Sequence, residues 1–138
     1  MTAIAKRQSF PSTPTTAGGA RRFLDGALTG PGLYPIVDTA ALLVSELVAN
    51  AVLHGGTPLE VVVAVDGARV RVEVHDGSPR LPVKKNYSTM SGTGRGLVLV
   101  ERMSSRWGAD TTPTGKMVWF ELDAATAPTI DLLGVDGL

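Results

Sequence analysis

Residues 36–54 read IVDTAALLVSELVANAVLH, and this stretch carries the strongest structural signal in the chain. Apolar side chains would point in almost every direction around a helix built on it, and Gly55-Gly56 follows directly as a helix stop. A helix that is apolar nearly all round is buried on most sides. The sequence therefore predicts a central helix packed within one core.

Three polar residues interrupt this helix along one narrow stripe, because Glu46, Asn50 and His54 are spaced four residues apart. A carboxylate and an amide on a buried helix cost free energy unless a partner satisfies them. One interpretation is a buried hydrogen bond between Glu46 and Asn50, with His54 exposed at the helix end. The other is a stripe facing a ligand cavity, where Glu46 acts as a base and Asn50 offers its carbonyl oxygen to Mg²⁺. The helix alone leaves both interpretations open.

Two hairpins are predicted after the central helix. Residues 60–65 and 70–75 are β-rich runs joined by a short Asp-Gly turn, which is typical of a hairpin. Residues 107–112 and 117–122 predict a second hairpin near the end of the chain.

Helices on either side complete the expected order of elements. Their signals lie at residues 14–28 and from just after Gly94 to Met103. The order of strand, helix, helix, two strands, loop, helix and two strands predicts the α+β class. We expect a two-layer sandwich, with a mixed, mostly antiparallel sheet and the helices on one face. One domain would span residues 1–122, followed by a loose C-terminal tail over residues 123–138.

Composition narrows the function before any motif is considered. The chain has 138 residues, and its 13 Lys and Arg balance its 13 Asp and Glu, so bulk charge does not favour nucleic acid or an anionic membrane. Cysteine is absent, which excludes disulfides, thiolate metal sites and cysteine nucleophiles. The N-terminus lacks the apolar core of a signal peptide, and no apolar stretch approaches the roughly 18 uncharged residues that span a bilayer. We therefore expect a cytoplasmic protein.

Two short segments after the first hairpin carry chemistry. The tetrapeptide DGSP at residues 76–79 consists of turn-forming residues, and a turn alone would account for it. At a pocket mouth, however, Asp76 would accept a hydrogen bond from an exocyclic amine. Residues 92–96 have glycine at every second position ahead of a helix, which lets backbone N–H groups approach phosphate oxygens. This run is neither a dinucleotide-binding fingerprint nor a Walker A loop.

As a set, these motifs resemble the histidine-kinase-like ATPase superfamily, whose ATP-binding (Bergerat) fold is shared by gyrase-type, chaperone and histidine-kinase ATPases. The set comprises Glu46-x-x-x-Asn50, Asp76-x-Ser and the Gly-x-Gly-x-Gly run, and the resemblance spans roughly residues 10–122. Within the superfamily, the segment SELVANA at residues 45–51 is most similar to bacterial anti-sigma factors that are serine-protein kinases.

The resemblance implies a role for each motif residue. Glu46 would be the general base that polarises the attacking hydroxyl, Asn50 would ligate Mg²⁺, and Asp76 would accept from the adenine N6 amine. Residues 78–92 would form the ATP lid. The implied nucleotide-binding residues are Asn50, Asp76, Gly77, Ser78, Gly92, Thr93, Gly94, Arg95, Gly96 and Leu97.

Two places depart from the family's pattern. Ser78 and Arg80 stand where the adenine-side motif has glycines. Met117 stands where the closing Gly-Thr-Thr or Gly-Lys-Thr motif has its final hydroxyl. A thioether cannot donate a hydrogen bond to a water at the adenine edge.

The function implied by the resemblance is that of an ATP-binding regulator of transcription. The expected protein is an anti-sigma factor with serine/threonine-protein kinase activity on a protein antagonist, and ATP and Mg²⁺ are its cofactors. The alternative is a nucleotide-sensing module that binds protein partners without phosphotransfer. The expected partners are ATP and a sigma factor, an anti-anti-sigma protein or both, with no direct nucleic acid and no membrane. A homodimer is compatible with this expectation.

Overall fold

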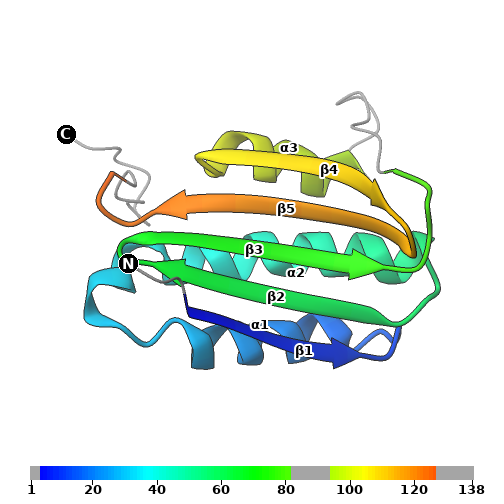
Figure 1. The fold of residues 1–138 in the computed structure, drawn as a ribbon, viewed down its shortest axis with the longest axis horizontal. Coiled ribbons are helices and arrows are strands. Elements are labelled where there is room, and N and C mark those ends of the chain that lie inside the picture. Colours follow the sequence, from blue (N-terminus) through cyan, green and yellow to red (C-terminus); the bar gives the residue numbers. More distant parts are fainter. Residues whose placement is uncertain (1–3, 82–93, 127–138) are drawn as a thin grey trace.

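The computed structural model describes residues 4–81 and 94–126, in which a layer of helices covers one face of a sheet (Figure 1). The elements in chain order are β1 (Ile4–Phe10), α1 (Thr16–Ala27), the 3₁₀ helix η1 (Pro31–Ile36), α2 (Val37–His54), β2 (Leu59–Asp66), β3 (Arg69–Asp76), α3 (Gly94–Met103), β4 (Arg106–Thr112) and β5 (Gly115–Asp123).

The sheet has the strand order β1-β2-β3-β5-β4, and all four of these pairings are antiparallel. The two predicted hairpins are present as β2–β3 and β4–β5. Helices α1, α2 and α3 lie together on one face of the sheet (Figure 1). The predicted α+β sandwich is therefore confirmed.

The core lies between the sheet and the helices. Alternate residues of β3 face inward, so that Val70, Val72 and Val74 are at most 2% exposed. Fully buried side chains come from both layers and include Leu24, Leu43, Val44, Val48, Val61, Val63, Leu97, Val100 and Phe120. Burying each such side chain contributes about 1.5–3 kcal/mol, so this cluster holds the two layers together.

Helix α2 lies between α1 and α3 in the helix layer (Figure 1). Its side chains Leu43, Val44 and Val48 are fully buried, whereas Leu42 is 40% and Leu53 66% exposed. The side of α2 that faces the core is buried, as the sequence predicted. The opposite side of α2 is open.

The segment formed by η1 and α2 is strongly apolar. The run Pro31–His54, which joins η1 and α2, is long and apolar enough to cross a membrane by length and composition. It contains Asp38 and Glu46, so it is not the uncharged run of roughly 18 residues that the composition excluded. In the fold, 44% of the 18-residue window is buried inside the protein, as in the core helix of a globular domain.

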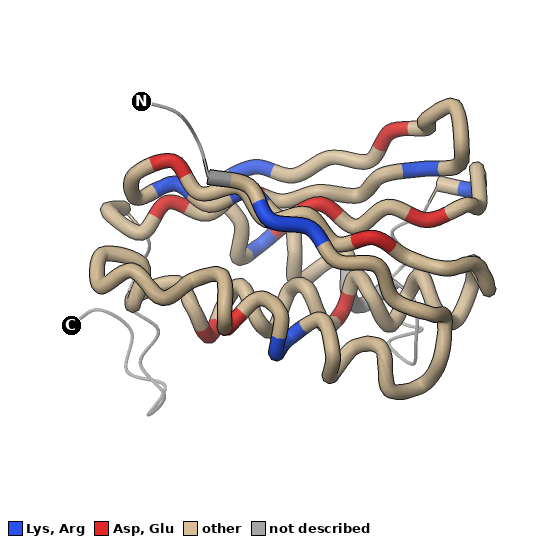
Figure 2. The backbone as a smooth tube through the Cα atoms, turned by 60° about the horizontal axis from the view of Figure 1, so that its bottom comes forward, with Lys and Arg blue, Asp and Glu red and all other residues tan. Residues whose placement is uncertain are grey.

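Charges of both signs are interspersed along the strands (Figure 2). On the face of the sheet away from the helices, Arg71 contacts Glu73 at 2.8 Å and Glu121 at 3.1 Å, and His75 Nε2 lies 2.8 Å from Glu73. The Arg71 guanidinium also lies 4.0 Å from the ring centroid of Trp119. This cluster spans β3 and β5 on their outer surface.

The C-terminal part of the described chain packs against the β2–β3 turn. Asp123 is the last residue of β5, and Ala124 is buried with its N–H donating to the Ala68 carbonyl at 2.8 Å. Residues 127–138 of the expected tail and residues 82–92 of the expected lid lie outside the described residues.

Candidate functional site

Four elements meet at one end of the domain: α2 and β3 end there, and α3 and β5 begin there (Figure 1). The antiparallel register places Asp76, the last residue of β3, between Leu59 on β2 and Lys116 on β5. The elements that carry the predicted site residues therefore converge on one end of the molecule.

Asp76 and Lys116 form a buried ion pair at this end. Lys116 Nζ lies 2.8 Å from Asp76 Oδ2 and 3.0 Å from Oδ1. The side chains of Lys116 and Asp76 are 7% and 2% exposed, respectively. Removing one partner of such a pair leaves an uncompensated buried charge, so each of these charges depends on the other.

Close backbone packing surrounds the ion pair. Gly115 has φ +156°, and a Cβ at this position would lie 2.0 Å from the Asp76 carbonyl oxygen. On the neighbouring side, the Gly77 N–H donates to Thr57 Oγ1 at 2.8 Å. Only glycine at position 115 lets β5 start this close to the end of β3.

The residues after Asp76 form a turn stabilised by the same carboxylate. The Ser78 N–H donates to Asp76 Oδ1 at 2.8 Å, and the Arg80 N–H donates to Ser78 Oγ at 3.4 Å. The turn interpretation of residues 76–79 therefore accounts for their backbone. The carboxylate itself is buried.

Lys116, and not Met117, is the β5 side chain that meets Asp76. Met117 lies opposite His75 and belongs to the outer face, whereas Lys116 is on the inward face with the buried Val118. The expectation that Met117 is the altered residue at this edge is therefore wrong. The alternation of the buried β5 residues could have revealed this, because position 116 lies two residues before Val118.

Glu46 and Asn50 lie one turn apart on α2, and both are half-buried. Within the part of the chain that the structure describes, neither side chain makes a hydrogen bond or ion pair, and no fully buried polar side-chain atom lacks a partner. The buried Glu46–Asn50 hydrogen bond of the first interpretation is therefore absent. His54 is exposed, as that interpretation expected.

The glycine run is only partly described. Gly92 and Thr93 lie outside the described residues, and Gly94, Arg95 and Gly96 form the start of α3. Leu97 is 1% exposed and belongs to the core, so its side chain cannot face a ligand. The first four backbone N–H groups of a helix have no acceptor within it, so residues 94–97 present N–H donors with a partial positive charge.

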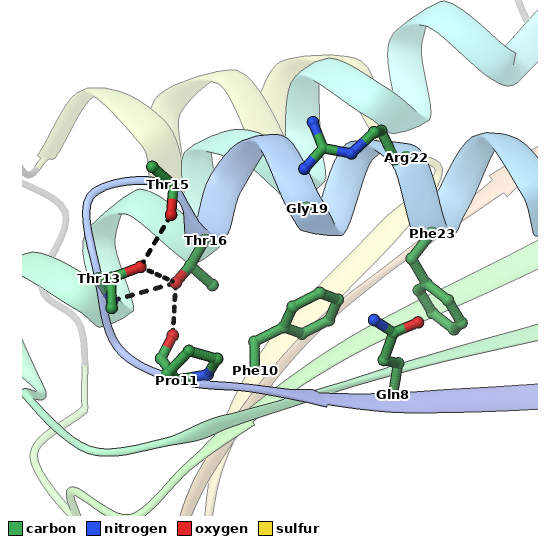
Figure 3. A pocket seen from close by; sticks show the side chains of 9 residues that line it. All are labelled: Gln8, Phe10, Pro11, Thr13, Thr15, Thr16, Gly19, Arg22 and Phe23. Atoms are coloured by element: carbon green, nitrogen blue, oxygen red, sulfur yellow. Dashed lines mark hydrogen bonds between the residues drawn. The ribbon is translucent and has the colours of Figure 1, made fainter.

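A separate groove of about 460 Å³ lies between β1 and the start of α1 (Figure 3). Its lining includes Gln8, Phe10, Arg22 and Thr16, and Thr16 Oγ1 donates to the Pro11 carbonyl. None of the predicted site residues lines this groove. No cluster of three or more His, Asp or Glu side chains suited to a metal occurs among residues 4–81 and 94–126.

Comparisons with known proteins agree with the fold and with the family that the sequence resembles. The profile of the histidine kinase-like ATPase domain family matches residues 10–122. No curated protein matches the chain. A solved structure of the RsbU and RsbW domains of Rv1364c from Mycobacterium tuberculosis is similar, with a TM-score of 0.66 and 20% sequence identity. The match covers 87% of this chain and 32% of the solved one, so this chain spans about a third of the length of the solved chain.

Proposed function

Because the chain belongs to the histidine kinase-like ATPase domain family, we propose that it binds ATP with Mg²⁺ where α2 and β3 end and α3 begins. We infer further that it transfers phosphate to a serine or threonine of a protein partner. The observation that carries this proposal is the state of Glu46 and Asn50: within the described residues both are half-buried and have no side-chain partner, on the helix that forms the core.

Asn50 offers an oxygen ligand for Mg²⁺, and the start of α3 offers hydrogen-bond donors for the phosphates of ATP. A neutral amide oxygen suits Mg²⁺, which binds few protein oxygens and keeps other positions for water and phosphate. Backbone N–H groups of residues 94–97 are placed to donate to phosphate oxygens. When bound, Mg-ATP supplies the phosphoryl group that is transferred.

Glu46 lies one turn before Asn50 and has a different task in this proposal. Its carboxylate orients the attacking hydroxyl and accepts its proton. The hydroxyl oxygen then carries the γ-phosphoryl group, and ADP is the leaving group. Asp76 accepts one hydrogen bond from the adenine N6 amine.

We propose that the protein partner is a sigma factor, its antagonist protein or both. The support for this is the resemblance of residues 45–51 to anti-sigma serine kinases, together with the fold shared with the RsbU–RsbW structure. A regulator of this kind acts in the cytoplasm, where its partners are.

A nucleotide-sensing module without phosphotransfer remains the second candidate. It is favoured by one observation, the buried Asp76–Lys116 ion pair, because a carboxylate that already has a cationic partner is a weaker acceptor for a base. The two candidates differ in the role of Glu46, because phosphate transfer needs its carboxylate and nucleotide binding does not.

Calorimetric titration of ATP, with and without Mg²⁺, tests the binding step. Asn50→Ala should weaken Mg-ATP binding by about tenfold or more, because it removes the metal's protein oxygen. His54→Ala is the matched control, since His54 lies on the same stripe but is exposed at the helix end. Unchanged Mg-ATP affinity in Asn50→Ala would contradict the metal site.

Transfer of radiolabel from ATP to a purified antagonist protein tests the chemical step. Glu46→Ala should leave the ATP affinity within a few fold and lower transfer by about 10² to 10⁴, the usual contribution of a general base. Binding of Mg-ATP by the unmodified protein with no transfer to any antagonist would favour the sensing module.

A further inference from the structure

The Asp76 carboxylate is already largely engaged inside the fold. Oδ1 accepts two hydrogen bonds, from the Ser78 N–H and from Lys116 Nζ, and Oδ2 lies 2.8 Å from Lys116 Nζ in the ion pair. A carboxylate oxygen has two acceptor positions, so one position on Oδ2 remains. The Asp76–Lys116 pair is also neutral as a unit.

A nucleobase that binds at this edge competes with Lys116 for the Asp76 carboxylate. The ammonium group of Lys116 is a cation and forms an ion pair with the Asp76 carboxylate, whereas the adenine amine is a neutral donor. The adenine amine can therefore donate only to the remaining position on Oδ2. The charge of that carboxylate is already compensated by Lys116. The base amine contributes little to binding under these conditions.

The same ammonium group changes which bases are excluded. An unpaired carboxylate accepts from the adenine amine and repels the carbonyl oxygen that guanine presents at the same ring position. Lys116 Nζ lies 2.8–3.0 Å from the carboxylate oxygens, and its positive charge attracts the carbonyl oxygen that the carboxylate alone would repel. The repulsion that would reject guanine is therefore offset.

We propose that Lys116 is the specificity-determining residue of the base site, holding Asp76 in a neutral pair so that the site discriminates weakly between adenine and guanine nucleotides. This inference rests on the proposed function, because it presupposes that a nucleoside triphosphate binds here. Binding then depends mainly on the phosphates, the metal, Asn50 and the start of α3.

The unmodified protein provides the first test. Dissociation constants are measured for Mg-ATP, Mg-GTP and the Mg complex of purine riboside triphosphate, which lacks the 6-amino group. We expect all three within about tenfold of one another, because the amine is worth less than one full hydrogen bond here. A loss of more than about tenfold on removing the amine alone would overturn the inference.

Substitution of Lys116 provides the second test. Lys116→Met keeps the length of the side chain and removes the ammonium group, and Lys116→Thr retains a neutral hydroxyl donor. Both should raise the preference for ATP over GTP by about tenfold or more, because the freed carboxylate accepts the amine and repels the guanine carbonyl. Lys6→Thr, a change of the same charge on the exposed edge strand β1, should leave the preference unchanged.

The outcomes separate this inference from the proposed function. Thermal melts establish that each variant is folded, and if both Lys116 variants unfold, the comparison of the three nucleotides on the unmodified protein decides. An ATP preference that is equal in the unmodified protein and in a folded Lys116 variant overturns the inference while nucleotide binding stands. Absence of binding of every triphosphate to the unmodified protein and to Asn50→Ala alike overturns the proposed function, and this inference with it.

Discussion

At the scale of single residues, the candidate site depends on Gly115 as much as on its charged neighbours. The ion pair of Asp76 and Lys116 needs the first residue of β5 to touch the last residue of β3. A Cβ at Gly115 would lie 2.0 Å from the Asp76 carbonyl oxygen, so there is no room for a side chain. A backbone constraint and an ionic contact therefore support each other at adjacent positions.

Gly115→Ala should destabilise the protein by about 3 kcal/mol or more, because it adds a steric clash with backbone to a conformation that L-residues rarely adopt. Gly67→Ala is the matched control: Gly67 has φ +62° in the β2–β3 turn, but a Cβ there would meet no atom within 4 Å apart from its chain neighbours. That substitution should cost only about 1–2 kcal/mol. Urea unfolding measures both, and equal losses would mean that β5 can shift away from Asp76.

At the scale of elements, charged side chains rather than apolar contacts link β3 to β5 on the outer face of the sheet. Burial alone would raise the pKa of Glu73, but its hydrogen bonds and charge interactions with Arg71 and His75 outweigh burial, and the pKa is lowered. Burial likewise disfavours the charged form of Arg71, yet Glu73 and Glu121 raise its pKa. The ionised cluster therefore stabilises the pairing of β3 with β5.

Glu73 should contribute to stability in acid with a defined sign. Because its pKa is lower in the folded protein than in the unfolded chain, its contribution is present above the ordinary carboxyl value of 4.5. The contribution is lost as the pH falls through the lower folded value.

Measuring unfolding free energy against pH tests this. Glu73→Gln should be less stable than the unmodified protein at pH 6–7, and the difference should shrink below about pH 4. Asp66→Asn, which removes a carboxylate from the exposed end of β2, controls for the change in net charge. A difference that stays constant across the acid range would show that the cluster is not coupled to folding.

At the scale of the whole molecule, one end of the two-layer sandwich collects residues that are distant in sequence. The groove between β1 and α1 lies at the same end but on the edge strand β1, because the register aligns its lining residue Phe10 with Leu59 and Leu59 with Asp76 (Figure 1). The groove and the ion-pair region are therefore separate candidates for where a nucleotide binds (Figure 3). Anything that binds only the folded state stabilises it, by about 2.7 kcal/mol at a concentration 100 times its Kd.

Mg-ATP should therefore raise the melting temperature and slow backbone hydrogen exchange at the converging end. The N–H groups expected to gain protection belong to residues 76–78, residues 94–97 and Lys116, because they border the proposed site. The N–H groups of Gln8 and Arg22, which line the groove, serve as the internal control. Protection confined to the groove would place the nucleotide there instead.

Most elements could be predicted from the sequence because their signals are local. The β-rich runs predicted β2–β3 and β4–β5, and the apolar stretch before Gly55 predicted α2, since side-chain periodicity follows from backbone geometry. The family profile over residues 10–122 matches the extent of the resemblance seen in the motifs. The roles assigned to Glu46 and Asn50 stay predictions.

By itself, the sequence determined the kinds of elements, their order and the family, since these depend on residue types at short and regular spacing. Only the tertiary structure decided that Glu46 and Asn50 are not bonded to each other and that the inward-facing Lys116 forms an ion pair with Asp76. Asp76 and Lys116 are 40 residues apart, and what brings them together is the packing of β3 against β5. A one-residue change of that register would turn Met117 inward and Lys116 to the outer face, so strand pairing sets the chemistry of this edge.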